Sequence, residues 1–176
     1  MGDSYDIVKR FWRNLLRNWA PLYAEPTFIP DELREDFTRV TTIPILGGNP
    51  PPPYSIFNDP DTGISLKDRG RKRKTHIAVE TISEQLSTGK ARCVVTFDQS
   101  FSFSADRKSL IVSKLNSLSA CGYECFYYTS HAAFLFAVPK WQPIDELVGL
   151  IIAAGVPEAR LIMGTGRTGS SSSGRG

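Results

Sequence analysis

Length, composition and charge exclude several classes of protein. The chain has 176 residues, which fits one modest domain with extensions rather than two full domains. Its three cysteines lack the number and regular spacing of a disulfide framework, so we expect an intracellular protein in a reducing compartment. A net charge of +3 is too small to identify a nucleic-acid-binding protein, so the positions of the cations matter more than their sum.

The N-terminal segment, residues 1–20, predicts a basic amphipathic helix. Residues 5–20 read YDIVKRFWRNLLRNWA, with apolar side chains at helical spacing, cations mostly on the other side, and Pro21 directly after them. The apolar side either packs on the rest of the protein or lies in an anionic membrane surface. The membrane alternative assigns the contact to Lys9, Arg10, Phe11, Trp12, Arg13, Leu16, Arg17 and Trp19.

Residues 21–74 are broken by prolines and predict an extended, partly disordered arm. Only residues 31–40, capped by Asp31, favour a short helix there. Within the arm, Pro51, Pro52, Pro53 and Tyr54 form the Pro-Pro-x-Tyr pattern that WW domains bind as a polyproline II segment. The alternative is a proline-rich spacer.

The arm ends in a basic run at residues 67–74, KDRGRKRK. Such a run binds phosphates through counterion release, serves as a nuclear import signal, or docks on anionic lipid. The alternative is a solvated loop. The residues assigned to nucleic-acid or lipid binding are Arg69, Arg71, Lys72, Arg73 and Lys74.

From residue 75 the apolar residues become dense, so we expect a globular α+β domain at 75–164 and a flexible tail at 165–176. Residues 75–83 and 91–104 alternate and predict an antiparallel strand pair. From residue 91 the predicted order is strand, helix, strand, strand, helix, strand. This order favours a small antiparallel sheet with two helices, the ferredoxin-like split βαββαβ arrangement, plus one extra strand.

Catalytic and metal-binding patterns are not apparent in the sequence. We find no nucleophile with a base, no paired carboxylates and no phosphate-cradling glycine loop, so we expect a non-enzymatic protein without a cofactor. Three cysteines and a histidine, Cys93, Cys121, Cys125 and His131, have spacing unlike that of a zinc knuckle. We expect the cysteines to pack as small apolar side chains.

Together, the basic helix, the Pro-Pro-x-Tyr motif at Pro51, Pro52, Pro53 and Tyr54, the basic run and the small domain resemble the matrix proteins of rhabdoviruses. This resemblance implies a virion protein at the inner membrane face of the host cell, where it self-associates and links an anionic membrane to viral nucleoprotein or RNA. It also implies recruitment of host ubiquitin ligases through WW domains, and the basic run, as an import signal, predicts entry into the nucleus. The alternative hypothesis is a nucleic-acid-binding viral accessory or regulatory protein, of the silencing-suppressor type.

Overall fold

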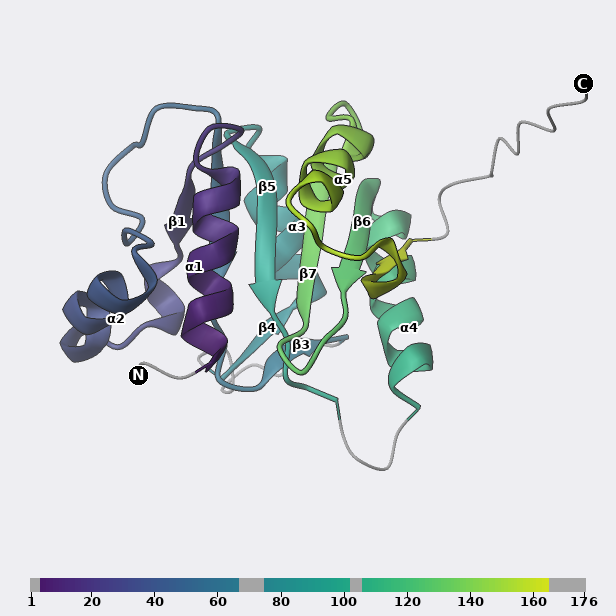
Figure 1. The fold of residues 1–176 in the computed structure, drawn as a ribbon, viewed down its shortest axis with the longest axis horizontal. Coiled ribbons are helices and arrows are strands. Elements are labelled where there is room, and N and C mark those ends of the chain that lie inside the picture. The colour runs from purple at the N-terminus through teal and green to yellow at the C-terminus, as the bar shows by residue number, and fades with distance from the viewer. Residues whose placement is uncertain (1–3, 67–74, 102–105, 165–176) are drawn as a thin grey trace, which may run out of the picture.

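A six-stranded mixed sheet runs through the middle of the molecule (Figure 1). The computed structural model describes residues 4–66, 75–101 and 106–164. The strand order is β1-β2-β5-β7-β6-β8, in which β1, β2 and β5 are parallel and the remaining pairs are antiparallel. A separate parallel pair is formed by β3 and β4. The strands are β1 (Leu22–Ala24), β2 (Tyr54–Asn58), β3 (Gly63–Ser65), β4 (His76–Ala78), β5 (Ala91–Phe97), β6 (Tyr123–Tyr128), β7 (Phe134–Pro139) and β8 (Leu161–Met163).

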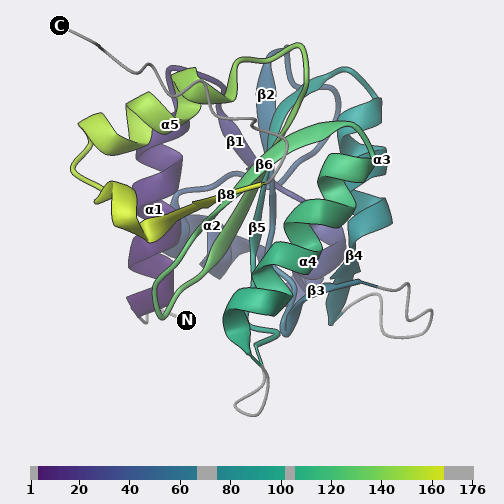
Figure 2. The ribbon, with the colours of Figure 1, turned by 90° about the vertical axis from the view of Figure 1, so that its right-hand side faces the viewer.

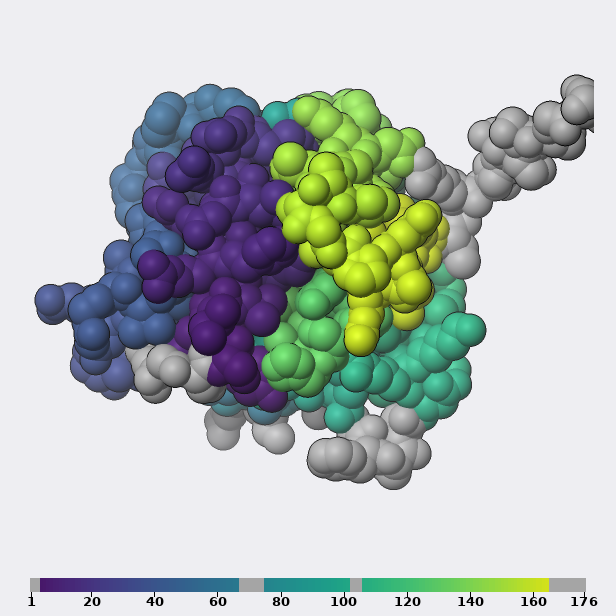
Figure 3. Space-filling view, in the orientation of Figure 1, coloured from purple at the N-terminus to yellow at the C-terminus, as the bar shows by residue number. Residues whose placement is uncertain are grey.

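Helices cover both faces of this sheet. One face carries α1 and α5, which lie side by side in Figure 3, and the opposite face carries α3 and α4 (Figures 1 and 2). The α-helices are α1 (Ser4–Leu16), α2 (Arg34–Thr41), α3 (Val79–Ser87), α4 (Arg107–Ala120) and α5 (Ile144–Ala153). Short 3₁₀ helices occupy η1 (Pro26–Phe28), η2 (Asp31–Leu33) and η4 (Glu158–Arg160).

Strict alternation in the central strands produces two apolar cores. In β7, Phe134, Phe136 and Val138 face α1 and α5, whereas Leu135 and Ala137 face α3 and α4. Side chains of successive strand residues point to opposite faces, so a strand buried on both sides reads as an almost continuous apolar run. The aromatic side chains of these strands therefore pack in the interior of the protein.

The predicted α+β class is confirmed, but the ferredoxin-like arrangement is not. The elements from β5 to β8 do follow the predicted order along the chain. In space, however, β8 pairs with β6, and the position beside β5 is taken by β2. The two helices of the motif, α4 and α5, also lie on opposite faces of the sheet. The result is a three-layer sandwich rather than a sheet covered on one face.

The antiparallel pair predicted for residues 75–83 and 91–104 is wrong. Within the first predicted strand, residues 75–83, only residues 76–78 form a strand, and this strand pairs in parallel with β3. The chain then enters α3, whose buried side chains Val79, Ile82 and Leu86 follow helical spacing. The second predicted strand, β5, ends at Phe97.

The boundary predicted at residue 75 falls inside the sheet. Two segments of the predicted arm are strands, β1 at one edge and β2 between β1 and β5. All five residues of β2 are buried, because the strand is paired on both sides and covered on both faces. Residues 21–66 are therefore integral to the fold, and the short helix expected at 31–40 appears as η2 followed by α2.

Candidate functional site

The Pro-Pro-x-Tyr motif is divided between surface and core. Pro51, Pro52 and Pro53 are exposed, but Tyr54 begins β2 and its side chain is buried, with the residue only 7% exposed. Its ring packs edge-on against Tyr23, with 6.1 Å between ring centroids. A WW domain must hold the tyrosine ring in its own groove, so the folded chain does not present the complete motif.

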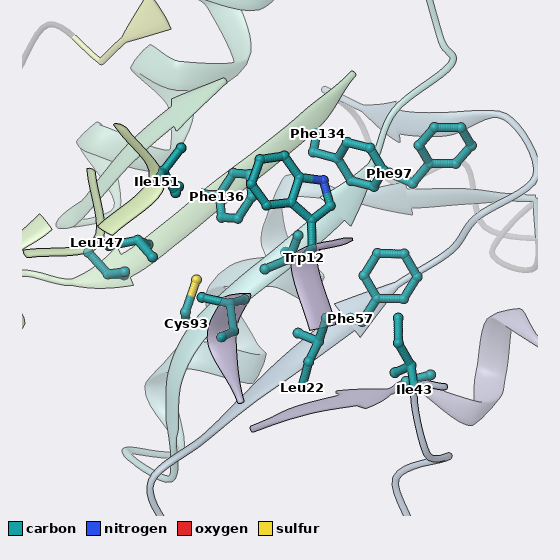
Figure 4. Close-up of a cluster of buried hydrophobic side chains, with 14 of the residues drawn as sticks. Trp12, Leu22, Ile43, Phe57, Cys93, Phe97, Phe134, Phe136, Leu147 and Ile151 are labelled. Carbon is teal, nitrogen blue, oxygen red and sulfur yellow. The ribbon is translucent and has the colours of Figure 1, made fainter. Parts of the chain in front are cut away.

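The apolar side of α1 belongs to the core. Trp12 is fully buried and packs edge-on against Phe134 and Phe136, at centroid distances of 5.9 and 5.0 Å (Figure 4). It also packs edge-on against Tyr128 and Phe11, at 5.1 and 4.8 Å. Leu16 is also fully buried. The membrane role predicted for Trp12 and Leu16 is therefore wrong, because both side chains already pack on the sheet and are removed from solvent.

The remaining residues of the predicted membrane set separate into three kinds: a buried lysine, two half-buried aromatic residues and three arginines. Lys9 is buried and forms an ion pair with Asp59, with 2.7 Å between Nζ and Oδ2. Phe11 and Trp19 are half-buried against the same core, and Arg92 lies over the Trp19 ring. The cations still at the surface are Arg10, Arg13 and Arg17, with Arg13 half-buried. Among the described residues, no helix has the length and apolar character required to span a bilayer.

The basic run lies outside the described residues, so the role predicted for Arg69, Arg71, Lys72, Arg73 and Lys74 stays a prediction.

The cysteines and His131 do not meet. Cys93 faces α1 and α5, and Cys125 faces α3 and α4, on the other side of the sheet. Cys121 is exposed at the end of α4, and the His131 ring packs against Tyr5, with 5.5 Å between centroids. Burial raises the pKa of the Cys125 thiol to about 11. In the part of the chain that the structure describes, no group of three or more possible His, Cys, Asp or Glu ligands gathers in one place.

A buried carboxylate, Asp98, organises the end of the sheet where β5 finishes. Its Oδ2 accepts from Lys114 Nζ at 2.6 Å and from the Tyr127 hydroxyl at 2.7 Å. Its Oδ1 accepts from the backbone nitrogens of Ile64 and Ser100 and from the Ser100 hydroxyl. Five donors thus compensate the desolvation of one buried negative charge. We call these residues the Asp98 network.

The Asp98 network ties α4, β6 and β3 to the end of β5. Burial lowers the pKa of Lys114, and burial together with the neighbouring Asp98 charge raises the pKa of Tyr127. β3 approaches so closely that a Cβ on Gly63 would lie 2.2 Å from Asp98 Oδ1, and Gly63 also has a φ of +99°. Both facts require glycine at this position. The network is therefore a brace that fixes where α4 lies.

The first turn of α4 borders a hollow of about 690 Å³. Its other walls come from the β6–β7 turn and from the segment around η4, and Figures 1 and 2 show the start of α4 and the β6–β7 turn at the same lower end of the molecule. We call this the basic hollow. The lining residues that matter for its chemistry are Arg107, Lys108, Arg160, His131, Ile111 and Ile162.

Two of the three cations in the basic hollow are held by hydrogen bonds to the β6–β7 turn. Arg107 Nη2 donates to the carbonyl of Ser130 at 2.7 Å, and Arg160 Nη1 donates to the carbonyl of Thr129 at 3.3 Å. The Arg107 guanidinium also lies over the Phe101 ring, 4.7 Å from its centroid. These contacts hold both side chains near the hollow, where they can still donate to a ligand.

Asp106 supplies the opposing charge. Its side chain caps α4 by accepting from the backbone nitrogen of Lys108 and from the Ser109 hydroxyl, and these hydrogen bonds lower the pKa of Asp106. The hollow therefore combines three cations with one carboxylate that already has local partners. This balance favours an anionic ligand.

Sequence reasoning missed this site because its residues come from three separate segments, around 106–111, 129–131 and 160–162. The only local signal is an N-cap aspartate followed by an Arg-Lys pair. Comparison with known proteins adds no further assignment: no family model, curated protein or solved structure gives a significant match to this chain.

Proposed function

We propose that the protein is a non-enzymatic nucleic-acid-binding protein and that the basic hollow is its contact site. The observation that carries the proposal is the convergence of Arg107, Lys108 and Arg160 on one concave surface. Arginine and lysine donors bind phosphate oxygens with charge-assisted hydrogen bonds. The attraction for a phosphate backbone would then come from a local cluster of cations around a hollow, and a large net charge is not required.

The matrix-like function is the less favoured candidate. It requires Trp12 and Leu16 to contact lipid, although both side chains are fully buried in the core. Its WW-domain recruitment depends on Tyr54, whose ring is buried beside Tyr23. A WW domain that bound the folded chain as tightly as a peptide covering residues 47–58 would restore this candidate.

Salt-dependent binding tests the proposal. We would titrate the full chain with a labelled oligonucleotide at several salt concentrations and repeat the titration with Lys108→Gln/Arg160→Gln. Each phosphate contact contributes about −0.7 to the log–log slope on a single strand, so losing two contacts should make the slope shallower by about 1.4. The control is Lys90→Gln, an exposed lysine just before β5, at the opposite end of that strand from Asp98. An unchanged slope in the double variant would place binding elsewhere.

A further inference from the structure

The basic hollow has two chemically different parts. Its lining includes the cations Arg107, Lys108 and Arg160 as well as the apolar side chains of Ile111 and Ile162. Ile111 is only 1% exposed, so the apolar surface within reach of a ligand comes from half-buried Ile162, which packs against the core beneath α4 from β8. A ligand in the hollow would therefore place an apolar or aromatic group on Ile162 and negative charge beside the cations.

His131 provides an aromatic surface at the same place. The side chain is exposed in the β6–β7 turn and lines the hollow. Its ring packs against Tyr5 with 43° between the ring planes, which supports it from the α1 side. Nucleic-acid bases stack on such supported rings without regard to their identity, because every base has a π face.

We infer that the basic hollow takes an unpaired nucleotide of a single-stranded nucleic acid, with the base against His131 and Ile162 and the flanking phosphates on the three cations. The inference rests on the proposed function and narrows it. A duplex keeps its bases stacked inside and offers mainly phosphates and groove edges to a protein surface, so it would place no base on His131 and Ile162.

The test compares single-stranded and duplex oligonucleotides of the same sequence, as RNA and as DNA, by fluorescence anisotropy with the full chain. We expect tighter binding of the single strands. His131→Ala should weaken single-strand binding about tenfold, in line with the usual loss on removing a stacking side chain, and should leave the salt slope unchanged. His131→Phe should restore affinity, because it returns a ring without the polar nitrogens. Thermal melts of each variant establish that the fold is intact.

The outcomes separate this inference from the proposed function. Equal or tighter duplex binding that still depends on Lys108 and Arg160 would overturn the inference and leave the proposed function standing. So would unchanged single-strand affinity in His131→Ala. If no oligonucleotide binds even at low salt, both fail. Single-strand preference for RNA alone, or for DNA alone, supports the inference and identifies the sugar that the site accepts.

Discussion

The helix α1 and the basic hollow are both rich in cations, but they use them differently. On α1, Arg10 and Arg13 point away from the core, whereas Lys9 is buried and neutralised by Asp59 and Asp6. Around the hollow, Arg107, Lys108 and Arg160 come from two distant segments and converge on one concavity. A run of cations along one helix therefore indicates a solvent-exposed helix face, whereas a binding site requires the fold to bring together cations from distant segments.

The largest expected effect tests whether α1 is structural. Trp12→Ala removes a fully buried ring that contacts four aromatic neighbours, and we expect it to lower the free energy of unfolding by about 3–5 kcal/mol. Arg10→Ala, on the exposed side of the same helix, is the matched control and should change it by less than about 0.5 kcal/mol. Urea denaturation measures both. Similar small losses would mean that α1 does not hold the core together.

A slightly smaller effect tests the Asp98 network. Lys114→Met leaves Asp98 without its ion-pair partner in a buried position, and breaking a buried pair costs about 3–5 kcal/mol. We expect about 3 kcal/mol, because Tyr127, Ser100 and Ile64 still donate to the carboxylate. Lys108→Met, an exposed lysine on the same helix, should be close to neutral in denaturation. A stable Lys114→Met variant would show that the network does not brace α4.

These contrasts also show what the sequence could predict. Local periodicity was sufficient for α1, whose predicted core alternative is the observed one, and for the elements from α4 to β8. It failed where alternation at Ile77 and Val79 resembled a strand, although Val79, Ile82 and Leu86 have helical spacing. It also failed at β2, because the preceding prolines suggest an arm and only pairing with the distant β1 and β5 makes the segment a central strand.

The binding site was less predictable than the fold. Arg107 and Lys108 read as ordinary first-turn residues of a helix, and Arg160 lies more than fifty positions later. Their proximity follows from the return of β8 to the edge of β6, which no local pattern indicates. The basic run at 67–74, the strongest electrostatic signal in the sequence, lies outside the described residues and stays a separate prediction.

The smallest expected stability effect is the pH dependence of the Lys9–Asp59 pair. Burial raises the pKa of Asp59 above its usual 3.8 and outweighs the attraction of Lys9. Between pH 3.8 and the raised value, the native state holds more protons at this site than the unfolded state. Stability contributed by protonated Asp59 is therefore present below pH 3.8 and lost as the pH rises through the raised pKa.

The measurement is the difference in urea unfolding free energy between the wild type and Asp59→Asn across a pH series. The other carboxyl groups are the same in both proteins, so their contributions to the pH dependence cancel in this difference. We expect the wild type to lose stability relative to the variant as the pH rises from about 4. Glu84→Gln, an exposed carboxyl group, should give no such trend. A difference that grows in favour of the wild type would mean that the ion pair with Lys9 dominates.

One charge-matched comparison tests the central claim most directly. Arg107→Gln/Lys108→Gln/Arg160→Gln and Arg10→Gln/Arg13→Gln/Arg17→Gln each remove three positive charges, one set from the basic hollow and the other from α1 and the residue that follows it. We expect the hollow variant to lose most of its single-strand affinity and about 2.1 of the salt slope, and the α1 variant to bind nearly as the wild type does. Equal losses in the two variants, or a larger loss in the α1 variant, would contradict the account.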